Sequence, residues 1–307
     1  MLQVNGGAHM CHLACLTGRR NTMHGDEGNS MKILSATKCM TLAAALLLGS
    51  VWSQPTHTAS QKLVLTGAST IAPLAGELAR RFELLHPGVR VDVQTGGSAR
   101  GINDARKGIA DIGMVSRALK PEEKYLHAHA IALDGVGIIV HASNRIPALS
   151  RRQAIDIYTG QIVNWKVVGG PDAPITVVNK AEGRSTLELF LNYLNLKNSD
   201  VKAHVIIGDN SQGIKTVAGN PNAISYVSIG AAEYESRHGT PIKLLPLDGI
   251  AASVENVRNG IYPLSRPLNL VTQGVPKGLV RDFIEFARSE QVHDLVEAQY
   301  FVPLSAH

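Results

Sequence analysis

The segment Val89–Asp104, "VRVDVQTGGSARGIND", decides the fold, because it joins a strand to a helix through a glycine-rich turn. Valines at 89, 91 and 93 alternate with other residues, which is the period of a half-buried strand. A glycine-rich turn before a helix exposes backbone N–H groups that have no intrahelical partner, and the helix dipole adds positive character there. Such a corner can bind an anion, and it can also be a plain connection.

The alternation of strand and helix continues on both sides of this segment. Gln61–Thr66 has the composition of a strand, and apolar residues from Ile71 to Leu85 then recur at helical spacing. Ile102–Ile109 marks the next helix, and Ala110–Ser116 is another strand. The order β-α-β-α-β within about 55 residues predicts an α/β domain with a parallel sheet.

A second series of strands and helices follows Leu133–Asn144, a buried strand that leaves the first sheet. Its expected elements are Arg151–Gly160, Ile175–Lys180, Arg184–Leu194, Ala203–Ile207, Ala223–Ile229, the extended run Tyr262–Gly274 and an amphipathic helix carrying Leu279, Phe283, Phe286 and Ala287. The two extended runs lie about 120 residues apart, and we expect them to be the paired crossings of a hinge. The predicted lobes are residues 61–142 plus 267–307, and residues 143–266.

The N-terminal region has the layout of a secretory signal from Met31 onward. Lys32 and Lys38 precede an apolar run, Cys39–Trp52, and small Ser53 follows it. The run is too short to span a bilayer comfortably. We therefore predict a signal peptide over residues 31–53, a leader or mis-assigned start over residues 1–30, and a soluble periplasmic protein.

Cysteine content and charge exclude several classes of function. All three cysteines, Cys11, Cys15 and Cys39, lie before residue 54, so the mature chain is expected to lack disulfides, a thiolate nucleophile and a cysteine-ligated metal. The net charge is +5 but the basic residues are dispersed, which argues against nucleic acid as a partner. His127 and His129 have no supporting acidic cluster, and a surface or helix-end position is favoured over a metal site. We expect no metal and no cofactor, and a monomer.

Three predicted strand-to-helix corners carry hydroxyl side chains, with basic residues close to them in sequence. The hydroxyl residues are Ser69 and Thr70, Ser98, and Ser185 and Thr186, and the basic residues are Arg117, Lys180 and Arg184. In an open α/β sheet such corners converge at the carboxyl ends of the strands. Each corner alone could be an ordinary helix cap, because Ser and Thr are the usual capping residues. Together the three corners favour a cleft that binds a small oxyanion.

Enzymatic alternatives are poorly supported by the motifs. "GGSAR" (Gly96–Arg100) lacks the second glycine of the G-x-S-x-G nucleophile elbow, and the sequence has no phosphate-binding G-x-x-x-x-G-K-[ST] loop. A secreted phosphatase would need a nucleophile beside a base, or a metal pair, and the sequence offers neither clearly. A transcriptional effector domain would need an N-terminal helix-turn-helix, where this chain has the predicted signal. We expect no catalytic residues.

From about Leu63 to Pro303 the chain resembles the periplasmic phosphate-binding proteins of ABC importers, which have the type II periplasmic binding-protein fold. The resembling segments, in family order, are "LTGASTIAPLAGELARRFELLHPGVRVDVQTGGSARGI", "ADIGMVSRALKPEE", "ALDGVGIIVHASN", "IYTGQIVNWKVVGGPDAPITVVNKAEGRST", "NPNAISYVSIG" and "VRNGIYPLSRPLNLVTQG". The resemblance implies two lobes joined by a hinge, inorganic phosphate as ligand and a membrane permease as partner. It also implies the phosphate-binding residues Ser69, Thr70, Ser98, Ser116, Arg117, Lys180, Arg184, Ser185 and Thr186.

The sequence departs from the family pattern at two places. The segment usually written R-x-x-G-S-G-T reads "KAEGRST" here, so Lys180, Arg184 and Ser185 replace the usual arginine, serine and glycine. Lysine cannot form the bidentate fork of arginine. Arg117 also stands where some members have an aspartate that accepts the proton of hydrogen phosphate. Sulfate, molybdate or another tetrahedral anion therefore remains an alternative ligand, and Glu182 is a candidate substitute acceptor.

Overall fold

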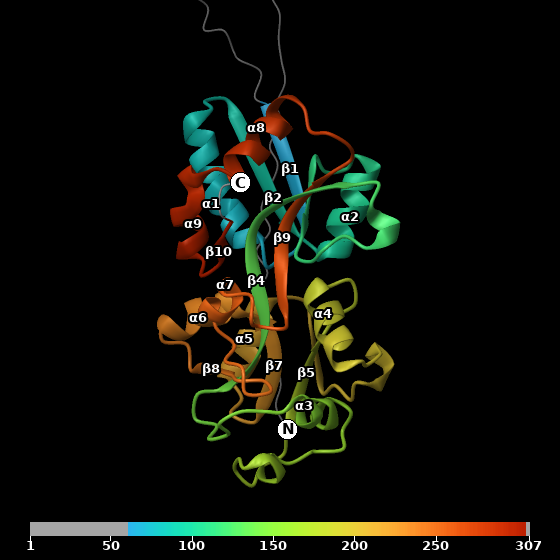
Figure 1. The fold of residues 1–307 in the computed structure, drawn as a ribbon, viewed down its shortest axis with the longest axis vertical. Coiled ribbons are helices and arrows are strands. Elements are labelled where there is room, and N and C mark those ends of the chain that lie inside the picture. The colour runs from blue at the N-terminus through green and yellow to red at the C-terminus, as the bar shows by residue number, and fades with distance from the viewer. Residues whose placement is uncertain (1–60, 305–307) are drawn as a thin grey trace, which may run out of the picture. The chain divides into compact units, whose positions relative to one another are not determined.

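The computed structural model describes residues 61–304 (Figure 1). The predictions for residues 1–30 and 31–53, and the three cysteines, lie outside the described residues. Within this range no helix is long and apolar enough to cross a membrane. The described residues belong to a single compact unit, so the predicted lobe boundaries stay predictions.

The first series of elements forms a parallel sheet, as the sequence predicts. The elements are β1 (Gln61–Gly67), α1 (Ala72–Leu85), β2 (Val89–Thr95), α2 (Ser98–Lys107) and β3 (Ile112–Val115). Strand β1 lies between β2 and β3 and is parallel to both. The prediction of an α/β fold is confirmed.

Two strands far apart in sequence run side by side through the molecule (Figure 1). Strand β4 (His127–His141) begins before the predicted Leu133 and pairs antiparallel with β9 (Ser265–Thr272). In this register Asp134 lies opposite Arg266. Beyond Gly135, β4 leaves β9 and pairs with β7 and β8, so one strand belongs to both halves of the sheet.

The remaining elements complete the two halves. The strands are β5 (Thr176–Lys180), β6 (Val205–Ile207), β7 (Ala223–Ser228), β8 (Ile242–Leu245) and β10 (Val302–Pro303), and the hydrogen-bonded order is β2-β1-β3-β9-β4-β7-β5-β6, with β8 and β10 also pairing with β4. The helices are α3 (Arg151–Tyr158), α4 (Ser185–Leu194), α5 (Asn210–Ala218), α6 (Ile229–Arg237), α7 (Val254–Arg258), α8 (Gly278–Ala287) and α9 (His293–Ala298). Short 3₁₀ turns span Pro121–Glu123, Trp165–Val168, Asn198–Asp200 and Glu290–Val292. The sequence analysis missed α5, α6, α7 and α9 and the strands β8 and β10.

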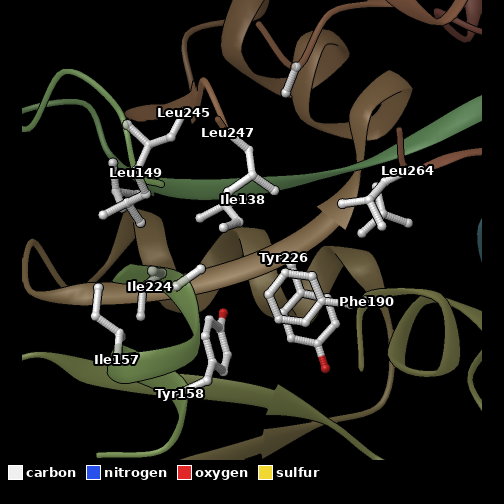
Figure 2. Close-up of a cluster of buried hydrophobic side chains, with 14 of the residues drawn as sticks. Ile138, Leu149, Ile157, Tyr158, Phe190, Ile224, Tyr226, Leu245, Leu247 and Leu264 are labelled. Atoms are coloured by element: carbon white, nitrogen blue, oxygen red, sulfur yellow. The ribbon is translucent and has the colours of Figure 1, made fainter. Parts of the chain in front are cut away.

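An aromatic cluster fixes α4 against β7 (Figure 2). The rings of Phe190 and Tyr226 are stacked with centroids 3.9 Å apart, and Tyr158 packs edge-on against both. All three side chains are fully buried. The Tyr226 hydroxyl also accepts a hydrogen bond from the Lys180 backbone N–H at 3.3 Å. The core therefore positions the N-terminus of α4 and the end of β5 together.

Glycine allows α2 to approach the first sheet closely. A Cβ at Gly101 would lie 2.8 Å from the carbonyl oxygens of both Thr66 and Met114. Neither backbone atom can move without disturbing the strands to which it belongs. This contact sets the position of the glycine-rich turn in front of α2.

We predict that Gly101→Ala lowers the free energy of unfolding by about 1–3 kcal/mol, because the added methyl group meets strand backbone. Gly76→Ala in α1 is the matched control, since its Cβ would meet no atom within 4 Å. That control should be neutral or stabilise by up to about 1 kcal/mol through helix propensity. Urea denaturation measures both changes, and equal stabilities for the two variants would contradict the close approach.

Candidate anion-binding site

A buried arginine on β9 forms the centre of a polar cluster. Arg266 is 2% exposed, and its Nη2 and Nε donate to Oδ2 of Asp134 at 2.8 and 3.2 Å. The other oxygen of Asp134 accepts hydrogen bonds from Ser228 Oγ at 3.0 Å and from the Gly230 N–H at 3.2 Å. Both carboxylate oxygens are therefore engaged, and they fix the orientation of the guanidinium.

The two terminal nitrogens of the Arg266 guanidinium, Nη1 and Nη2, also contact three other segments of the chain. Nη1 of Arg266 donates to Thr186 Oγ1 at 2.9 Å and lies 3.4 Å from both Oγ and the carbonyl oxygen of Ser116. Nη2 donates to Thr70 Oγ1 at 3.3 Å. One side chain thus connects the corners after β1, after β3 and at the start of α4.

The glycine-rich turn that begins α2 joins the same cluster. The Ser185 hydroxyl donates to Ser98 Oγ, which also accepts the Ser116 N–H at 3.2 Å. Ser98 and Ser185 are 1% and 2% exposed. The Ala99 N–H donates to the Gly183 carbonyl at 3.2 Å, so backbone as well as side chains connect the two corners.

A buried lysine completes the cluster from β5. Lys180 is 2% exposed, and its Nζ donates to Oδ1 of Asn210 at 3.1 Å. Nδ2 of Asn210 in turn donates to Thr70 Oγ1 at 3.2 Å. Burial, together with the nearby positive charge of Arg266, lowers the pKa of Lys180 to about 7.

Arg184 lies at the edge of the cluster and is half-buried. Its side chain passes the glycine-rich turn so closely that a Cβ at Gly97 would lie 2.9 Å from its Cδ. Gly97 also has a φ of 92°, a conformation that other residues rarely adopt. The Nε of Arg184 is buried and has no hydrogen-bond partner among the described residues.

The hydroxyl residues at the three corners do not cap their helices. The N-cap residues of α1, α2 and α4 are Ile71, Gly97 and Arg184, and none of these caps has a side-chain hydrogen bond. Side chains do cap four other helices, namely Ser150 on α3, Asp209 on α5, Ser228 on α6 and Ser253 on α7, whereas α8 and α9 also lack a side-chain cap. The capping alternative is therefore wrong for these corners. Apart from the Ala99 N–H, which donates to Gly183, their first-turn N–H groups keep the ability to bind a ligand.

The guanidinium of Arg117 takes part in an ion-pair network. Its Nη1 and Nη2 donate to the two oxygens of Glu123 at 2.6 and 2.8 Å. Its Nε lies 3.0 Å from Oε2 of Glu188 on α4, and Lys120 Nζ lies 3.0 Å from the same oxygen. The network thus connects the segment after β3 to α4.

The structure brings together most of the residues that the sequence analysis selected. Those in the cluster are Thr70, Ser98, Ser116, Lys180, Ser185 and Thr186, with Arg184 beside them. Ser69 is half-buried and precedes Thr70 in the same turn.

The sequence analysis missed Arg266, Asp134 and Asn210. Arg266 and Asp134 are charged residues within otherwise apolar strand segments, and a buried charge is rare unless it is paired. Their charge within apolar strands could therefore have pointed to Arg266 and Asp134 from the sequence. Asn210 follows β6 at the start of a helix that the sequence analysis did not predict, so no pattern pointed to it.

We predict that Asp134→Asn lowers the free energy of unfolding by about 3–5 kcal/mol, because it leaves the buried guanidinium of Arg266 without a counter-ion. Asp172→Asn is the matched control, since Asp172 forms an exposed pair with Lys166 at 2.9 Å. The control should change the stability by less than about 1 kcal/mol. Urea denaturation measures the free energy of unfolding of both variants. Similar decreases in the two would show that the buried ion pair contributes no more than an exposed one.

Comparisons with known proteins show to which family the chain belongs. The family model for the PBP superfamily domain matches residues 53–291. The phosphate-binding protein PstS of Bacillus subtilis is 29% identical over 253 residues, which cover 80% of this chain and 82% of the relative. Similarity therefore extends over nearly the whole described region.

Two solved structures share the fold and a substantial part of the sequence. A putative phosphate ABC transporter substrate-binding protein from Clostridium perfringens, solved with bound phosphate, has a TM-score of 0.73 at 34% identity and covers 80% of this chain and 100% of its own. An ABC-type phosphate transport receptor from Vibrio cholerae has a TM-score of 0.66 at 30% identity with the same coverage. The chain belongs to the PBP superfamily, among the substrate-binding proteins of phosphate ABC importers, and has their type II periplasmic binding-protein fold.

Proposed function

We propose that the chain is a non-catalytic binding protein that captures inorganic phosphate at the Arg266 cluster and delivers it to an ABC importer. One observation carries the assignment of the site. A single buried guanidinium contacts hydroxyl groups from three separate segments, those after β1 and β3 in the first series of elements and the start of α4 in the second. The relatives named above support phosphate as the ligand.

Arg266 prepares the hydroxyl groups to act as donors. The hydroxyls of Thr70, Ser116 and Thr186 each accept a hydrogen bond from the guanidinium. A hydroxyl that accepts on its oxygen keeps its own proton for another acceptor. An anion enclosed between the corners would therefore meet hydroxyl protons as well as those first-turn N–H groups of α1, α2 and α4 that have no partner within the protein.

The energy available is sufficient without a metal or a covalent bond. Hydrogen bonds to a charged group contribute about 1.5–3 kcal/mol each. Micromolar affinity corresponds to about 8 kcal/mol. A few contacts from the hydroxyls, the helix N-termini and Lys180 would reach this value.

Closure around the ion would couple binding to transport. Thr70, Ser98 and Ser116 come from the first series of elements, and Lys180 and Thr186 from the second. An anion held by both groups would stabilise the closed arrangement of two lobes, residues 61–142 plus 267–307 and residues 143–266. The strands β4 and β9 would be the hinge, a permease would recognise the closed form, and the protein would act as a periplasmic monomer.

Sulfate is the second candidate ligand, and the hydrogen bonds of Asp134 support it. Both oxygens of Asp134 are occupied by donors, and Arg117 stands where some relatives in the resembling family have an aspartate. No carboxylate of the cluster is thus free to accept the proton of hydrogen phosphate, the feature that distinguishes phosphate from sulfate.

Calorimetric titration of the anion-stripped protein with phosphate, and separately with sulfate, tests the proposal. We expect phosphate affinity in the micromolar range or tighter, and we expect Ser98→Ala and Thr186→Ala each to weaken it about tenfold or more. Thr216→Ala on α5 is the control, because its hydroxyl donates only to the Gln212 carbonyl of its own helix. Unchanged affinity in both site variants would refute this site, and tighter binding of sulfate would change the ligand.

A substitution of Arg117 tests independently whether this side chain contacts the bound phosphate. Because two carboxylates occupy its guanidinium, we expect Arg117→Gln to change the phosphate affinity much less than Thr186→Ala does. The same titration measures both variants. A loss of affinity in Arg117→Gln as large as that in Thr186→Ala would make Arg117 a direct ligand.

A further inference from the structure

We propose that, above neutral pH, Lys180 is a neutral amine in the free protein and becomes an ammonium when the anion enters, so that phosphate capture takes up a proton. The inference rests on the proposed function and concerns the same site. It assigns to this one residue the role of making the affinity depend on pH.

The surroundings of the amine explain why it lacks a counter-ion. The side chain of Lys180 is buried, and the partner of its Nζ is the neutral amide of Asn210 at 3.1 Å. Among residues 61–304 no carboxylate lies within ion-pair distance, 4.0 Å, of this nitrogen. A buried ammonium without an anionic partner is costly, and the group loses its proton instead.

The charged and titratable groups that face Lys180 act mainly in the same direction. Burial lowers the pKa of Lys180 most, the guanidinium of Arg266 on β9 lowers it further, and Arg184 at the start of α4 adds a smaller effect. Asp209, before α5, opposes them, but its carboxylate caps that helix through the Gln212 N–H at 2.8 Å. On β7, the Tyr226 hydroxyl contacts the backbone N–H of Lys180 and stays protonated, since burial raises its own pKa.

A bound phosphate dianion would raise the pKa of Lys180 again. An opposite charge within about 4–6 Å raises the pKa of an amine by about 1–3 units, because it stabilises the ammonium form. The lysine would therefore bind a proton as the site binds phosphate. An arginine at this position, as in the resembling family pattern, stays charged throughout and would take up none.

The linkage fixes the sign of the pH dependence. Between the pKa of the free protein, about 7, and the higher pKa of the complex, each step of one pH unit costs about tenfold in affinity. In the upper part of this range phosphate is almost entirely the dianion, so its own titration does not produce the slope there. Affinity should thus fall as the pH rises.

Direct titration of the side chain tests the free state. In protein labelled at the lysine ε-carbons, the NMR signal of Lys180 is the one that disappears in Lys180→Arg, or in Lys180→Gln if the arginine variant does not fold. We expect this signal to titrate with a midpoint near pH 7 in the free protein. With saturating phosphate the midpoint should move up by about 1–3 units.

Calorimetry tests the coupling to binding. Titrations in two buffers with different ionisation enthalpies count the protons taken up at about pH 8. We expect nearly one proton for the wild type and nearly none for Lys180→Arg, with a phosphate affinity that falls about tenfold per pH unit only in the wild type.

The outcomes separate this inference from the proposed function. A Lys180 signal that stays charged to about pH 9 in the free protein would overturn it, as would equal proton uptake in the wild type and Lys180→Arg. Absence of phosphate binding at every pH would overturn the proposed function and the coupling together. Phosphate binding without proton uptake would overturn the coupling alone.

Discussion

The ion pair between Arg266 and Asp134 is the interaction on which the site depends. Both side chains are 1% exposed, and they lie opposite each other in the pairing of β9 with β4. A slip of one strand by one residue would turn its charged side chain to the other face of the sheet and separate it from its partner. A buried charge without its partner costs several kcal/mol. The pair therefore fixes the register of the two strands and, through the guanidinium, the directions of three hydroxyl groups.

Tight aromatic packing lies beside the site, whereas some hydrogen-bond donors at its corners have no partner. The Tyr226 and Phe190 rings hold β7 and α4 together, and Tyr226 contacts the backbone of Lys180. Yet α4 begins without a side-chain cap, and the buried Nε of Arg184 has no partner among the described residues. Native proteins satisfy most buried polar groups, so an unpaired donor at the edge of the cluster is available to a ligand that supplies an acceptor.

Short-range patterns predicted the corners but not the residues that connect them. Thr70, Ser98 and Thr186 follow strands or glycine-rich turns, which the sequence displays directly. Arg266 and Asp134 are separated by 132 residues, and only the antiparallel pairing of β4 with β9 brings them together. Arg117 was selected as a basic residue close in sequence to the corners and from the family resemblance. In the folded protein its guanidinium instead pairs with the carboxylates of Glu123 and of Glu188 on α4. Local spacing carries no information about such distant partners.

The most direct test of the central claim is a crystal structure of the protein grown with arsenate, a tetrahedral analogue of phosphate whose arsenic atom is located by anomalous scattering. The account predicts one strong arsenic peak with arsenate oxygens within about 2.7–3.2 Å of the hydroxyl groups of Thr70 and Thr186, which still accept from Arg266. An arsenic peak elsewhere on the protein would contradict the assignment of the anion site.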